Sequence, residues 1–139
     1  MQIVMDAGAL NAFMRQEFPQ IAGNYRVEQV DDALLVARLS VDDSHLRPGG
    51  TVSGPSIFAL ADVAVYCAIL ARIGPVGLAV TTNASIDFMR KPEAGRDLRA
   101  ECRVLKLGRV LAVAEALIFS DGGADPVARC SMTYSIPPK

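Results

Sequence analysis

The stretch from Val52 to Leu70, VSGPSIFALADVAVYCAIL, limits the folds open to this chain more than any other. From Ile57 onward it is apolar except at Asp62. Its proline near the start and the Gly-Pro pair after its end predict a helix over residues 55–73, apolar on almost every side and therefore buried all round. An ionised carboxylate is costly to bury, so Asp62 needs partners, protonation, or a cleft in which it meets a ligand.

The segments around this helix predict an α+β fold. Residues 7–18 have the apolar spacing of a short helix that Pro19 ends. Strand-like patterns occupy residues 25–30, 33–41, 78–89, 97–108, 109–121 and 126–136. The 109–121 segment is apolar on both faces, as in a central strand. We therefore expect one domain over residues 1–139, with a helical segment at 1–23 and an antiparallel sheet wrapped around one long buried helix.

Composition excludes several classes of protein. The formal net charge is −1 and no basic stripe is present, so nucleic-acid binding is not expected. The cysteines lie among apolar neighbours, which predicts reduced, buried thiols in a cytoplasmic protein; they are Cys67, Cys102 and Cys130. The N-terminus lacks the pattern of a signal peptide, and the run over residues 57–71 is short for a membrane span. One face of the predicted sheet remains to be covered, so we expect oligomerisation.

Four segments match a known family in order and spacing: GGTVSGPSIFALAD, IDFMRKPEAGRDL, VLKLGR and VARCSMTY. Together they resemble the hotdog-fold acyl-CoA thioesterases of the phenylacetate-degradation type. The resemblance covers about residues 24–136, and its strength lies in the ordered set of motifs. It implies a hotdog fold, hydrolysis of an acyl or aryl thioester to free acid and CoA, and no metal or redox cofactor.

The resemblance assigns roles to four residues. Asp62 falls on the catalytic acid of the family, which acts as general base or nucleophile. Gly54 falls on the glycine whose backbone N–H polarises the thioester carbonyl. Thr81 matches the hydroxyl position that holds the attacking water, with Ser53 assisting. In the family the acid of one subunit faces the glycine of another, so the resemblance implies a homodimer or homotetramer.

The loop before the helix departs from the family pattern. Ser53 stands where the family has histidine, Pro55 replaces the second glycine, and Arg47 replaces asparagine. Because such loop residues orient the substrate, a non-catalytic acyl-CoA-binding protein remains an alternative. A dehydratase or hydratase of acyl thioesters has less support, since related enzymes pair the acid with a catalytic histidine that this loop lacks.

Each candidate residue also has a plainer explanation. Asp62 can be a structural acid that caps a loop or pairs with an arginine. Ser53 fits an N-cap better than a nucleophile, because no G-x-S-x-G motif surrounds it. His45, the single histidine, lacks the neighbours that a metal site or a cysteine nucleophile requires.

Basic side chains are candidates to bind the phosphates of CoA, because Arg and Lys suit that role. Scattered basic residues on strand ends and turns are also typical of an ordinary solvated surface. The candidates are Arg47, Arg90, Lys91, Lys106 and Arg109.

Overall fold

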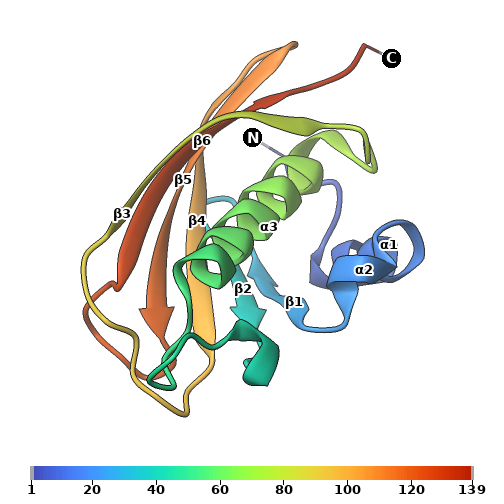
Figure 1. Ribbon diagram of the computed structural model, residues 1–139. Helices are drawn as coiled ribbons and strands as arrows, with labels where there is room; N and C mark the ends of the chain where they lie inside the picture. Colours follow the sequence, from blue (N-terminus) through green and yellow to red (C-terminus); the bar gives the residue numbers. More distant parts are fainter. Residues whose placement is uncertain (1, 139) are drawn as a thin grey trace.

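The computed structural model, which describes residues 2–138, shows six strands curving around one long helix (Figure 1). The strand order is β1-β2-β4-β5-β6-β3, and all neighbouring strands are antiparallel. The elements are α1 Ala7–Glu17, α2 Pro19–Ala22, β1 Tyr25–Val30, β2 Leu35–Leu39, the 3₁₀ helix η1 Asp43–His45, α3 Gly54–Ile73, β3 Val80–Phe88, β4 Leu98–Leu107, β5 Leu111–Ser120 and β6 Ala128–Ser135. The predicted α+β hotdog architecture is confirmed.

Local sequence sets both ends of α3. The Ser53 hydroxyl accepts a hydrogen bond from the Ser56 N–H at 3.4 Å, so the predicted N-cap is confirmed. Pro55 follows in the first turn, where a missing N–H removes no intrahelical bond. Gly74 ends the helix with φ 95°, a conformation that glycine adopts without strain. Both ends of the helix are thus fixed by local sequence. The helix lies on the concave side of the sheet (Figure 1).

The length of α3 corrects one expectation. The helix has 20 residues and a mean hydropathy of 1.9, so it is long and apolar enough to cross a membrane. However, 67% of its apolar window is buried inside the protein, where it packs against β2, β4 and β5. Packing within this fold accounts for its apolar character.

The middle of the sheet follows the sequence pattern closely. β5 lies between β4 and β6, so the predicted central strand is confirmed. Its inward positions carry small side chains, Ala112, Ala114 and Ala116, which let α3 approach the sheet. The outer face of β5 carries Leu117 and Phe119, so this strand is apolar on both faces as its sequence predicts. The neighbouring strand β4 adds polar side chains to the same face, including the ion pair between Arg99 and Glu101 with an N–O distance of 2.6 Å.

β3 forms an edge of the sheet and contains an irregularity that decides which way its side chains point. It pairs with β6 alone, and the register shifts between Thr81 and Asn83. Strict alternation predicts that Thr81 and Ile86 lie on opposite faces. In the structure Thr81 contacts Asp62 on α3 and Ile86 packs against the core, so that prediction is wrong. The extra residue of a β-bulge reverses the alternation.

The N-terminal segment forms two helices rather than one. The Asp6 side chain caps α1 by accepting a hydrogen bond from the Ala9 N–H at 2.8 Å. Phe18 leaves the helical conformation at φ −136° and ψ 53°, and Pro19 then begins α2. Pro19 therefore ends one helix, as its sequence position predicts, and also begins a second, because proline is suited to a first helical position.

Candidate active site

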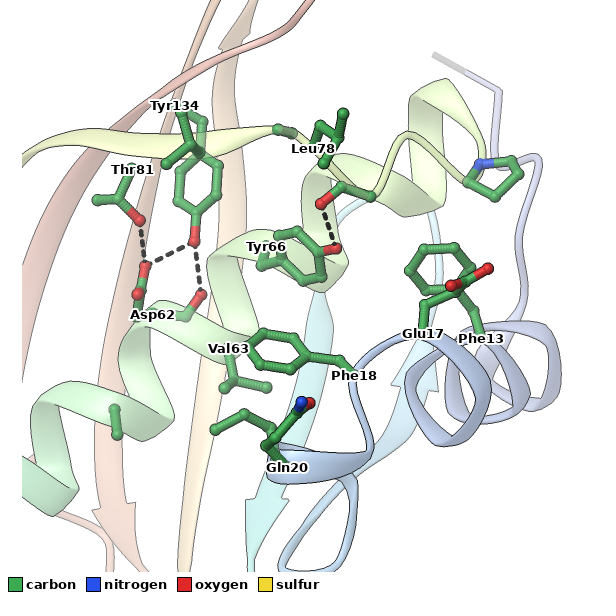
Figure 2. A pocket seen from close by; sticks show the side chains of 16 residues that line it. Phe13, Glu17, Phe18, Gln20, Asp62, Val63, Tyr66, Leu78, Thr81 and Tyr134 are labelled. Carbon is green, nitrogen blue, oxygen red and sulfur yellow. Dashed lines mark hydrogen bonds between the residues drawn. The ribbon is translucent and has the colours of Figure 1, made fainter.

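Asp62 is half-buried on α3, and its carboxylate is held by two hydroxyl groups (Figure 2). Thr81 Oγ1 on β3 donates to Asp62 Oδ1 at 2.7 Å. The Tyr134 hydroxyl on β6 lies 2.6 Å from the same oxygen and 3.2 Å from the Asp62 backbone carbonyl. Both contacts on the carboxylate use Oδ1, so Oδ2 remains available to a substrate or a water molecule. The chain tolerates this acid because Asp62 has two hydrogen-bond donors and also faces a cavity.

The sheet register explains why these two hydroxyls meet. Thr81 and Tyr134 are directly paired across β3 and β6, next to the bulge. Burial, and then the negative charge of Asp62 and the hydrogen bond to it, raise the pKa of Tyr134 well above its ordinary value. The phenol therefore stays protonated and remains a donor throughout the neutral range.

Tyr134 is a site residue that sequence reasoning missed. It lies in the final motif of the family resemblance, where no role was assigned to it. A signal was nevertheless present, since β6 alternates and Tyr134 shares the buried face with Cys130 and Met132. A phenol on a buried face needs a hydrogen-bond partner, which pointed to a polar group nearby.

The cavity beside Asp62 has a volume of about 700 Å³ and opens to solvent. Asp62, Thr81 and Tyr134 provide its polar end. Most of the remaining wall is apolar or aromatic and comes from α1, α2, α3 and the loop before β3; it includes Phe13, Phe18, Val63, Tyr66 and Leu78. This combination of a few convergent polar groups with an apolar wall is typical of a small-molecule site.

Gly54 lies in a different cavity of the same chain. This second cavity, about 420 Å³, is lined by Gly54 together with Arg47, Arg90 and Lys91. Eight helical positions separate Gly54 from Asp62, a rise of about 12 Å. One chain therefore does not bring the predicted oxyanion glycine to the predicted acid, and it gathers three of the five basic candidates around the glycine instead.

The other two basic candidates lie elsewhere. Lys106 and Arg109 belong to the end of β4 and the turn before β5, and they line neither cavity. Strand register places this hairpin at the end of the sheet where β3 begins. Arg90 and Lys91 follow the other end of β3, and Arg90 also donates to the Pro126 carbonyl at 2.9 Å. The predicted phosphate-binding residues thus form two separate groups.

Two remaining polar residues have structural contacts. Ser53 bonds to Ser56 as the helix cap, and its hydroxyl lies 3.1 Å from the Ser56 hydroxyl. His45 is buried in η1, where its Nδ1 accepts a hydrogen bond from the Asp42 N–H at 2.9 Å. Among residues 2–138, no group of three or more His, Cys, Asp or Glu side chains is arranged to hold a metal ion.

The cysteines have the inert character that their apolar neighbours predict. All three are free and buried. Burial raises the pKa of Cys67 to about 12, and burial is also the main cause that raises the pKa of Cys130 to about 11. A thiol must ionise to act as a nucleophile, so these groups are poor nucleophiles at neutral pH.

The chain is similar to known proteins in sequence as well as in fold. The family model described as Thioesterase superfamily matches residues 49–127. A Pseudomonas aeruginosa protein, PA0474, whose name proposes an esterase, is 32% identical over 117 residues, which cover 84% of this chain and 86% of that protein.

Solved structures show the same fold with high coverage. A crystal structure from Silicibacter sp. TM1040, whose name proposes a thioesterase, is 57% identical and has a TM-score of 0.92; the match covers 99% of this chain and 96% of that one. A mutant of the phenylacetic acid degradation protein PaaI from Thermus thermophilus is 27% identical, with a TM-score of 0.71 and coverage of 91% and 99%.

Proposed function

The chain belongs to the thioesterase superfamily and is an acyl-CoA thioesterase, and from this premise we propose that Asp62 is its general base. The observation that carries the proposal is the geometry of the carboxylate. Two hydroxyls hold Oδ1 and fix its orientation, while Oδ2 is left for a water molecule in the cavity. Such preorganisation is what general base catalysis requires.

The proposed hydrolysis proceeds in two steps. A water molecule attacks the thioester carbonyl carbon while Asp62 Oδ2 takes one of its protons, which forms a tetrahedral oxyanion. The oxyanion then collapses, the carbon–sulfur bond breaks, and the proton on Asp62 passes to the departing CoA thiolate. The proton of the Thr81 hydroxyl is directed at Asp62, so its lone pairs can accept a hydrogen bond from the same water.

The oxyanion requires a hydrogen-bond donor, and the two hydroxyls beside Asp62 already donate to its carboxylate. The Gly54 N–H is the first of α3, where N–H groups have no acceptor inside the helix and the dipole favours negative charge. Since Gly54 and Asp62 lie in separate cavities, we propose that two chains form a dimer and that each site combines Asp62 of one chain with Gly54 of the other. A tetramer built from two such dimers would contain the same site.

The edge of the sheet supports this pairing. β3 has nine residues and is mostly exposed, and its outer backbone groups are available to another chain. Exposed apolar side chains flank both of its ends, with Leu78 and Val80 near Asp62 and with Phe88 and Met89 near Gly54. One edge therefore connects the two cavities that the proposed site combines.

CoA phosphates would bind near Gly54 in the same proposal. Arg47, Arg90 and Lys91 give that cavity a positive charge suited to phosphate. We further propose that the enzyme works in the cytoplasm, which its three free thiols favour, and that it uses neither metal nor redox cofactor.

The test is the release of free CoA thiol from short, medium, long and aryl acyl-CoAs by the wild-type protein and by Asp62→Asn. We expect Asp62→Asn to lower kcat on the order of 10³-fold, because the base is lost while the volume is kept. Asp87→Asn, which changes an exposed acid on β3 paired with Arg129, should retain activity. Binding of acyl-CoA by a folded wild-type protein without thiol release would instead favour the non-catalytic alternative.

A further inference from the structure

Three aromatic rings follow one another along the wall of the Asp62 cavity (Figure 2). The Tyr134 ring, next to the acid, lies 6.2 Å from the Tyr66 ring between centroids. The Tyr66 ring lies 6.2 Å from the Phe18 ring, edge to face. Tyr66 is buried, and its hydroxyl donates to the Gly77 carbonyl at 2.9 Å, so the middle of the row is fixed. The row leads from the reacting end of the cavity to the N-terminal helices.

The charges on the cavity wall restrict what can occupy it. Among the residues that line it, Asp62 and Glu17 are acidic, and none is lysine, arginine or histidine. An acyl group with a terminal carboxylate would meet only negative side chains there, and no cation would compensate its desolvation. The wall therefore fits a neutral, apolar acyl group.

We propose that the acyl group extends along this aromatic row and that Phe18 is the residue that limits its length. The inference rests on the proposed thioesterase function and adds a specificity determinant to it. Two ring spacings of 6.2 Å set an upper limit on the span from Tyr134 to Phe18, which corresponds to roughly ten bonds of an extended chain at about 1.2 Å of advance per bond. A neutral acyl group of up to about ten carbons would reach Phe18, and a longer one would collide with it.

The position of Phe18 explains why it, rather than another wall residue, sets this limit. Val63 and Tyr66 are buried on the core helix. Phe18 lies at the break between α1 and α2, is 37% exposed, and points its ring toward Val63 and Tyr66 (Figure 2). It therefore closes the far end of the row from a segment outside the core.

The test compares neutral acyl-CoAs of four to sixteen carbons in the wild type, Phe18→Ala, Phe18→Leu and Phe18→Trp. We expect the wild-type kcat/KM to fall beyond about ten carbons. Phe18→Ala should raise the kcat/KM ratio of the longer to the shorter substrates by about tenfold, since one or two more methylenes are then accommodated. Phe18→Trp should move the limit to shorter chains. Val110→Ala, which removes an exposed apolar side chain outside the cavity, should leave the length profile unchanged.

The outcomes separate this inference from the function it rests on. Thiol release with the same length profile in all three Phe18 variants would overturn the role of Phe18 and leave the thioesterase function intact. No thiol release by the wild type from any thioester would overturn both. If Phe18→Ala does not fold, Phe18→Leu takes its place: the smaller leucine should move the length limit to longer chains, opposite to the shift expected for Phe18→Trp. Equal or faster turnover of a dicarboxylic acyl-CoA than of a neutral one of equal length would contradict the neutral cavity.

Discussion

At the scale of single residues, the site depends on which oxygen of Asp62 is occupied. Thr81 and Tyr134 both contact Oδ1, so the carboxylate cannot rotate freely without losing two hydrogen bonds. Such bonds to a charged group are each worth about 1.5–3 kcal/mol. The raised pKa of Tyr134 keeps its proton in place for this role. In the proposed mechanism the two hydroxyls act as positioning groups, and Oδ2 takes the proton.

Replacement of Tyr134 by phenylalanine tests this arrangement. We expect Tyr134→Phe to lower kcat by about 10- to 100-fold with little change in KM, because one bond that orients the base is lost. Tyr66→Phe is the matched control, since it removes a phenol from the same wall that bonds to Gly77 instead. Steady-state kinetics of thiol release measure both. Equal losses in the two variants would show that Tyr134 has no special relation to Asp62.

Gly54 permits an equally direct test of a backbone N–H. A Cβ at this position would lie 3.6 Å from the Phe88 ring, an ordinary contact, so Gly54→Ala should fold and keep the N–H. Gly54→Pro removes the N–H at a helical position that accepts proline, after a Ser53 whose ψ of 157° suits the residue before proline.

We expect Gly54→Pro to lower kcat by about 10²-fold relative to Gly54→Ala, which is the usual cost of one oxyanion donor. Thiol-release kinetics on folded protein, checked by circular dichroism, give the comparison. Similar kcat values in the two variants would show that the oxyanion is stabilised by another group.

The sequence predicts a site residue where local chemistry alone makes it unusual, and not where its role depends on long-range strand pairing. Asp62 is conspicuous because a charge within an apolar run has to be explained by local chemistry alone. Tyr134 and Thr81 meet it only through strand register and a bulge, which depend on long-range pairing. The resemblance predicts that Thr81 holds the attacking water; it does not predict the hydrogen bond from Thr81 to the Asp62 carboxylate.

At the scale of elements, α1 is attached to the rest of the fold by its buried side chains Leu10 and Met14 and by hydrogen bonds from Asn11 to the sheet. Asn11 on α1 donates to the Val27 carbonyl at 2.9 Å and accepts from the Val27 N–H at 2.8 Å. It thereby pairs with β1, the other edge of the sheet, where the β1–β2 register shifts. This contact holds α1, and with it Phe18, next to the cavity.

We expect Asn11→Ala to lower the free energy of unfolding by about 1–3 kcal/mol, because two part-buried backbone groups of Val27 lose their partner. Chemical denaturation measures the loss, and hydrogen exchange at the Val27 amide should accelerate. Gln16→Ala is the matched control, since it removes an exposed amide side chain from the same helix and should have little effect. A loss below about 0.5 kcal/mol in Asn11→Ala would contradict the proposed attachment, because a buried unpaired group costs more than that.

Element boundaries were predictable wherever one local rule applied. Strand β1 and the end of α3 match the expected residues, and α3 begins one residue early. The end of α1 also lies within one residue of the predicted end before Pro19, whereas the short helix α2 that Pro19 begins was not predicted.

At the scale of the whole molecule, one chain carries two separate cavities, which the proposed function combines into one site. The acid lies in one cavity and the helix N-terminus with its basic residues in the other. The separation of the two cavities is compatible with the sequence resemblance, which implies that the acid and the glycine come from different subunits; that implication stays a prediction. The proposed dimer joins them along the exposed edge strand β3.

Complementation between two impaired variants tests directly whether the active site is shared between two chains. Asp62→Asn and Gly54→Pro are mixed in equal amounts, unfolded and refolded together, and thiol release is compared with that of each variant alone. If the site takes Asp62 from one chain and Gly54 from the other, half of the dimers contain one intact site, and about a quarter of wild-type activity returns. Activity that stays at the average of the two separate variants, although mixed dimers have formed, would contradict the shared site.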